Sequence, residues 1–143
     1  MSNNKKKRGG GNNNPQRYTG KNVNVMGDSG RMEKHAIDVF RDMNRLKYNF
    51  DNIYEFQNRD FVYAAIRAAE KNHRRHDIIR NALDYAYGAS DDVDVISLRN
   101  IEQTTCAGWQ YIVNTMYAFM QTGDLGMIVG MAQQLSNNRN LRL

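Results

Sequence analysis

Cationic side chains are concentrated near the beginning of the sequence, and no acidic residue lies among them. A run of four adjacent cations comes first, and two more cations and one tyrosine follow. The side chains concerned are Lys5, Lys6, Lys7, Arg8, Arg17, Tyr18 and Lys21. Lys and Arg neutralise phosphates and release condensed counterions, which favours binding without contact to any base. A tyrosine beside them can stack on a base. These residue types therefore predict contact with nucleic acid.

The net charge of the chain is unevenly distributed. The whole sequence carries +5, yet residues 1–27 hold six cations and no acid. The other 116 residues hold 14 cations and 15 acids, which gives −1. Such asymmetry is typical of a basic arm that seeks an anionic partner. The alternatives are a solubilising tail, a nuclear-import signal and an arm that binds an acidic protein surface.

A second cluster of cations lies in the middle of the sequence. It consists of Arg67, Lys71, Arg74 and Arg75. Spacings of three and four residues place the first two, together with one of the last two, on one side of a helix. This side is a candidate for a second phosphate-binding patch. The nearby acids Glu70, Asp77 and Asp84 favour the alternative, an ordinary solvated helix face.

Other residue types give little sign of catalytic or metal chemistry. His73 and His76 stand one helical turn apart, but no third ligand is apparent, so we predict no metal site. Cys106 lies in an apolar segment, which predicts a small buried hydrophobic side chain. The acid-rich connector at residues 89–97 is too short for a divalent-cation loop. It predicts charge at a helix N-terminus or a landing point for a neighbour's basic arm. We expect neither an enzyme nor a cofactor.

The elements that must position these residues are predicted to be helices. Glycine and asparagine dominate residues 1–27, which cannot bury enough apolar surface to offset their ordering entropy. We therefore expect a flexible basic arm, a helical domain at residues 28–136 and a polar tail at residues 137–143. A single proline in the chain favours helices over a β fold with many turns. The predicted fold class is all-α, a compact bundle of four to six helices.

Capping residues locate the first helices. One helix is expected to begin after Asp28 or Ser29 and to fade near Lys47–Phe50. A short helical turn, capped at Asp51 or Asn52 and carrying Ile53, Tyr54 and Phe56, then leads to a second helix, which Asn58 caps. The polar stretch at residues 71–77 is either a break or the exposed middle of one long helix. Gly88 is a suitable C-terminal cap.

The strongest apolar periodicity lies in the last third of the chain and predicts a helix from about Ser97 to Gln121. Its stripe consists of Leu98, Ile101, Thr105, Trp109, Ile112, Met116 and Phe119. Gly123 should end this helix, and Asp124 should cap a last helix through Leu135. The apolar content of residues 98–135 is high for a small domain, which leaves an adaptable interface as the alternative to a pure core.

These features together predict a structural assembly protein whose basic arm contacts nucleic acid, DNA or RNA, through its phosphates. The composition of residues 1–27 resembles that of arms in virus coat, virion-internal and ribosomal proteins. We expect a homo-oligomer or a larger protein assembly, in a virion (as a capsid or connector component) or inside a cell. No secretion signal or membrane span is predicted.

Three alternatives remain open: a ribosome-associated protein, a protein–protein adaptor, and a DNA-binding packaging or regulatory factor. The last would need a helix–turn–helix unit, for which residues 61–88 are the only candidate.

Overall fold

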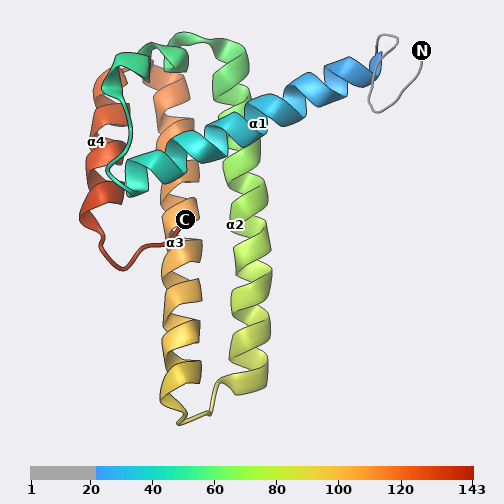
Figure 1. Cartoon of the computed structure of the whole chain (residues 1–143), viewed down its shortest axis with the longest axis vertical. Coiled ribbons are helices and arrows are strands. Elements are labelled where there is room, and N and C mark those ends of the chain that lie inside the picture. The colour runs from blue at the N-terminus through green and yellow to red at the C-terminus, as the bar shows by residue number, and fades with distance from the viewer. Residues whose placement is uncertain (1–21) are drawn as a thin grey trace. The chain divides into compact units, whose positions relative to one another are not determined.

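The computed structural model describes the backbone of residues 22–143 and the side chains from Ser29 onward. Four α-helices and one 3-10 helix follow one another along these residues (Figure 1). They are α1 (Asn22–Asn44), η1 (Phe50–Gln57), α2 (Arg59–Tyr87), α3 (Val93–Thr122) and α4 (Leu125–Asn137). No strand occurs in this part of the chain. The all-α prediction of four to six helices is confirmed.

The chain divides into two compact units at residue 35, and the packing described below is that of residues 36–143. The first unit contains most of α1 and all seven candidate residues of the predicted arm. Those candidates, from Lys5 to Lys21, lie outside the described residues.

Several helix ends lie where the capping residues predict them. The side chain of Asn58 accepts hydrogen bonds from the backbone N–H groups of Asp60 and Phe61, which satisfies two free donors at the start of α2. Gly123 ends α3 in the left-handed conformation, with φ of 66°, which glycine adopts without strain. Asp124 then caps α4 through the backbone N–H of Gly126.

Two other helix starts differ from the prediction. α1 begins at Asn22 rather than after Asp28 or Ser29, because an established helix extends at little further cost where no proline interrupts it. α3 begins at Val93 rather than near Ser97. The side chain of Asp92 accepts from the N–H groups of Asp94 and Val95 and so caps this helix. The acidic connector thus supplies helix N-terminal charge, one of its two predicted roles.

α2 and α3 form a long antiparallel hairpin, and its two halves differ in their surroundings (Figure 1). The polar stretch at residues 71–77 is the continuous middle of α2 and not a break. We call residues 78–101 the protruding half, and the remainder of the hairpin the core half. η1, α4 and the end of α1 contribute to the core together with the core half.

The hydrophobic core is built on Trp109, which is fully buried and meets the ring of Phe40 edge to face at 6.1 Å between centroids. Ala65 and Ala69 are also fully buried, and their small side chains let α2 approach its neighbours closely. The predicted α3 stripe is buried from Thr105 to Phe119. All the α2 and α3 residues among these belong to the core half.

The same stripe is exposed in the protruding half, where the sequence predicts burial. Leu98 is 53% exposed and Ile101 is 46% exposed. Ile78 and Ile79, which resume the apolar period of α2, are also exposed. Within residues 36–143, the two hairpin helices are the only helices at this end, so each covers just one side of the other.

The C-terminal segment after α4 is fixed on the core, although its composition suggests a polar tail. Leu141 is 3% exposed. The Arg41 Nε donates a hydrogen bond of 3.1 Å to the backbone oxygen of Leu143, and the Thr105 hydroxyl donates one of 2.9 Å to that of Arg142. Gly108 permits this packing, because a Cβ at that position would lie 2.6 Å from Leu141 Cδ1.

Candidate nucleic-acid interface

The four predicted cations of the second cluster lie on α2, near the junction of the two hairpin halves. Arg67, Lys71, Arg74 and Arg75 are all exposed. At 3.6 residues per turn, the first three fall on one side of the helix and Arg75 lies next to them. Because α2 is uninterrupted through residues 67–75, these side chains share a side of the helix, as their spacing predicts.

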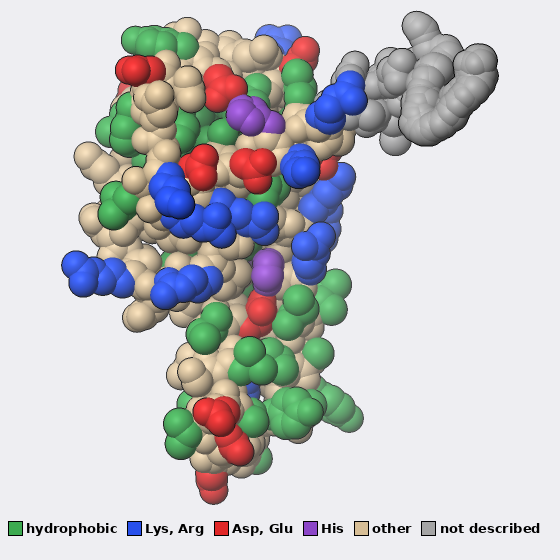
Figure 2. All heavy atoms as spheres, in the orientation of Figure 1, with side chains coloured by type: hydrophobic (Ala, Val, Ile, Leu, Met, Phe, Trp, Pro, Cys, Tyr) green, Lys and Arg blue, Asp and Glu red, His purple; other side chains and the backbone are tan. Residues whose placement is uncertain are grey.

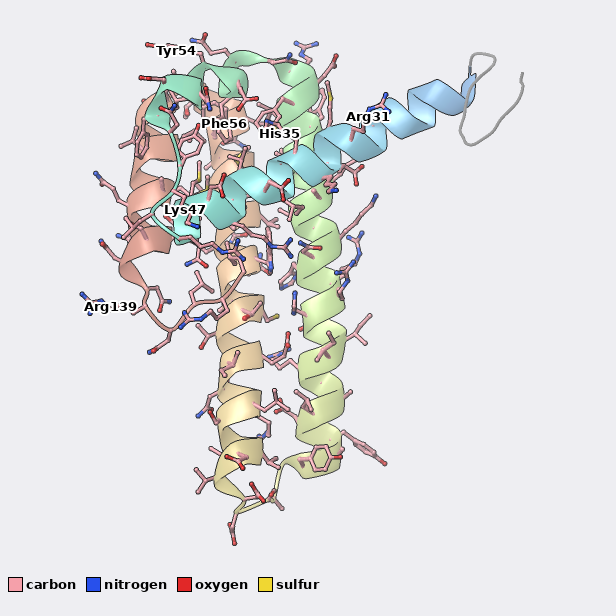
Figure 3. All side chains as sticks on the ribbon, viewed as in Figure 1. Arg31, His35, Lys47, Tyr54, Phe56 and Arg139 are labelled. Atoms are coloured by element: carbon pink, nitrogen blue, oxygen red, sulfur yellow. The ribbon has the colours of Figure 1, made fainter. Side chains whose placement is uncertain are left out.

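Five further cations outside α2 were not predicted. They come from the end of α1 and from the C-terminal segment: Arg41, Arg45, Lys47, Arg139 and Arg142. Figure 2 shows Lys and Arg side chains in a band across the middle of one face, and Figure 3 shows Lys47 and Arg139 on this side. We call the nine residues from both sets the cationic belt.

Hydrogen bonds between distant segments bring these five cations together. Besides the Arg41–Leu143 bond, the Asn44 side chain donates to the backbone oxygen of Leu135 and accepts from the N–H of Leu143. About 100 residues of sequence separate the partners, so no local pattern could reveal the contact. The only available signal is that Arg139 and Arg142 fall in a short polar segment.

The acids near the α2 cluster are directed toward α3 or paired along α2. Glu70 accepts a hydrogen bond of 2.8 Å from the Tyr117 hydroxyl, which raises the pKa of that tyrosine. Asp84 accepts one of 3.2 Å from Arg99. Asp77 accepts from Arg80 at 2.5 Å. In the sequence, these three acids indicate that the α2 cations form an ordinary solvated face. In the structure, each acid has a partner outside the cationic cluster.

Eight of the 13 acidic side chains of residues 36–143 lie at the two ends of the hairpin, and the other five lie nearer the belt: Asp38, Asp42, Glu70, Asp77 and Glu102. Of the eight, one group lies around η1 and the two neighbouring loops: Asp51, Glu55, Asp60 and Asp124. The other lies at the hairpin tip: Asp84, Asp91, Asp92 and Asp94. This partial separation of charge on a nearly neutral unit raises the positive potential near the belt, which suits a polyanion.

A polar layer fills the space between α2 and α3 at the junction of the two halves. His73, Asp77 and Cys106 each offer one metal-ligand atom, and these atoms lie within 4.8 Å of one another. The hairpin thus supplies a third donor that is not apparent from the sequence, because it brings residue 106 level with residue 77. Arg80 holds a positive charge beside Asp77, which opposes a cation there.

The thiol in this layer is poorly suited to bind a metal or to react. Cys106 is buried, as its apolar surroundings predict, and its Sγ lies 3.9 Å from the Asp77 carboxylate. Burial raises the pKa of the thiol; the positive charge of Arg80 acts the other way, and Asp77 and Glu102 add to the rise. The neutral thiol is therefore favoured. His76 pairs with Glu102 beside it.

An apolar cleft of about 430 Å³ lies between the end of α1, η1 and α4. It is lined by Met43, Leu46, Tyr48, Phe50, Ile53, Val129, Ala132, Gln133 and Ser136. Burial, with a smaller contribution from Glu55, raises the pKa of Tyr48 to about 12. This tyrosine is therefore unsuited to proton transfer near neutral pH.

The chain matches no protein-family model, and no match was found among curated proteins or solved structures. Among the described residues, no helix is long and apolar enough to cross a membrane. Functional inference therefore depends on the geometry and charge of the belt.

Proposed function

We propose that this protein is a structural assembly protein that binds nucleic acid non-specifically through its phosphates. The basic segment at residues 1–27 and the cationic belt supply the contacts. A virion component, such as a capsid or connector protein, is the setting that the composition of the basic segment favours. Copies of the chain, or a larger scaffold, would place many such segments around one polynucleotide.

The separation of charge is the observation that carries this proposal. The belt comprises nine cations of residues 36–143, and eight of the 13 acids of these residues lie at the two ends of the hairpin. The first 27 residues add six more cations and no acid. Exposed Lys and Arg contact phosphates without reading the bases, so affinity depends on salt far more than on sequence.

A sequence-specific DNA-binding factor is a poorer fit. The only helix–turn–helix candidate is residues 61–88, and this stretch belongs almost entirely to α2, a single continuous helix. The polar residues 71–77 continue the helix, so residues 61–87 contain no turn. A recognition helix docked in the major groove needs such a turn to orient it.

The test is the salt dependence of binding to random duplex DNA and to single-stranded RNA. If all six N-terminal cations engage phosphates, they contribute about −5 to the slope of the logarithm of the binding constant against the logarithm of the salt concentration on duplex DNA. Deletion of residues 1–21, which hold all six of these cations and end where α1 begins, should remove that contribution and leave the helices intact. Replacing the four belt cations of α2 with glutamine should flatten the slope by up to about 3.6.

Arg59→Gln is the matched control, because Arg59 is an exposed cation of α2 at the opposite end of the core half. It should leave the slope unchanged. If the deletion variant and the glutamine variant both bind as tightly as the intact chain at every ionic strength, the proposal is wrong. A preference for one sequence by orders of magnitude would favour the regulatory factor instead.

A further inference from the structure

The protruding half has an unusual concentration of exposed apolar side chains. Of the fifteen large hydrophobic residues exposed in the described part of the chain, eight fall within residues 78–101. They are Ile78, Ile79, Tyr85, Tyr87, Val93, Ile96, Leu98 and Ile101. Tyr85 is 95% exposed and Ile78 is 69% exposed. Scattered apolar residues are ordinary on a protein surface, but eight of them within the 24 residues of one hairpin end are a concentration of the kind that marks an interaction surface.

Charge is ordered along this part of the hairpin. Arg74 and Arg75 lie at one end, the apolar residues follow together with the ion pair of Asp84 and Arg99, and Asp91 and Asp94 lie at the tip. Ile78 follows Arg74 by four residues, so the cationic and apolar side chains occupy the same side of α2. In the opposite direction, the order is acidic, apolar and basic. The surface is therefore complementary to a reversed copy of itself.

We propose that a second copy of this chain binds here, so that two protruding halves pack antiparallel around a two-fold axis near Leu83. Arg75 precedes Leu83 by eight residues, or about 12 Å of helix, and Asp91 lies in the turn of the hairpin, four residues after α2 ends at Tyr87. The reversed copy places each acidic tip beside the other copy's Arg74 and Arg75. The four helices then bury the apolar residues of both copies in a small bundle.

The chemistry of the surface favours this occupant over others. A parallel arrangement would place cations against cations. The basic segment at residues 1–27 could pair with the acidic tip, but it has few apolar side chains with which to cover Ile78 and Tyr85. A polynucleotide offers phosphates, which the aspartates of the tip would repel.

This inference rests on the self-association that the proposed function includes and not on nucleic-acid binding. In the antiparallel pair, the tip of one copy reaches Arg74 and Arg75 of the other. The remaining seven cations of the belt lie outside this contact. The two proposals can therefore fail separately.

The first experiment is sedimentation equilibrium of the full chain, freed of nucleic acid by nuclease and high-salt washing. The intact chain should dimerise at micromolar concentrations. The double variant I78Q/Y85Q, which keeps every cation, should weaken the dimer roughly a hundredfold. Tyr54→Gln is the matched control, since Tyr54 is 65% exposed but lies on η1, and it should have no effect. A monomeric intact chain would overturn the proposal.

The second experiment tests the orientation by charge reversal. R74E/R75E and D91R/D94R should each weaken homodimers, because both ends of each pair become repulsive. An equimolar mixture of the two variants should restore dimers, since both ends of the mixed pair are attractive. Variants that fail to rescue each other would exclude the antiparallel pair. Loss of the dimer on deletion of residues 1–21 would identify that segment as the occupant and also overturn the proposal.

Discussion

The two halves of the α2–α3 hairpin share an apolar period but have different surroundings. In the core half, the α3 stripe from Thr105 to Phe119 is buried, whereas Leu98 and Ile101 of the same stripe are exposed. The difference is one of length. α3 has 30 residues and α4 has 13, so the hairpin extends about 45 Å and its neighbour only about 20 Å. Periodicity thus indicates which side of a helix is apolar, and the lengths of other elements decide whether that side is covered.

A polar layer separates the two halves. Asn72 is 7% exposed, and His73, His76 and Asp77 follow it on α2, facing a region of α3 that holds Glu102. Buried polar groups are tolerated where they find partners, and the facing helix supplies such a partner to His76. The core half therefore ends at a definite boundary, and the protruding half can respond independently to substitution.

Trp109→Ala should cause the largest loss of stability, because it removes the side chain on which the core is built. The indole is fully buried against Phe40, and its removal leaves a cavity in the core half. We expect about 3–5 kcal/mol less free energy of unfolding, measured by circular dichroism in urea. A loss below about 1 kcal/mol, close to the range of surface substitutions, would contradict the assignment of this residue to the core.

Ala69→Leu and Ala82→Leu compare the halves with one chemical change on one helix. Ala69 is fully buried, and three extra carbons there should cost about 1–3 kcal/mol through overpacking. Ala82 is exposed in the protruding half, so the same change should shift stability by less than about 0.5 kcal/mol. Equal effects in a urea titration of the two variants would remove the distinction between the halves.

Local sequence signals predicted most of the fold. Asn58, Gly123 and Asp124 mark helix ends because capping is a contact between neighbouring residues. The all-α class follows from apolar spacing. Burial of the C-terminal segment could not be predicted, because it depends on contacts such as Arg41 to Leu143 between opposite ends of the helical unit.

The candidate site was predicted only in part, because some of its residues meet through contacts between distant parts of the sequence. The four α2 cations stand together in the sequence, so their shared side was visible. Arg41, Lys47 and Arg139 join the belt only when α1, α4 and the C-terminal segment pack together. Cys106 becomes a neighbour of His73 and Asp77 only through the hairpin, whose register no local pattern specifies.

Removing a helix cap from each half of the hairpin compares the two halves through smaller losses of stability. Asn58→Ala removes the cap of α2 in the core half and should lower the global free energy of unfolding by about 1 kcal/mol. Asp92→Ala removes the cap of α3 at the hairpin tip, where the helix ends can open alone.

We therefore expect Asp92→Ala to accelerate amide hydrogen exchange in the first turns of α3, with little change in the denaturation midpoint of the dilute protein. A global loss as large as that of Asn58→Ala would show that the tip is coupled to the core.

Leu98→Ala should have the smallest effect, although it deletes a large side chain from the same stripe as Trp109. The Leu98 side chain is 53% exposed, so its removal forms no cavity and returns little apolar area to water. The free energy of unfolding of the dilute monomer should change by less than about 0.5 kcal/mol. At high concentration, the same variant should weaken the dimer, because the second copy is what covers Leu98. A loss above about 2 kcal/mol in the monomer would mean that this side chain is buried within its own chain.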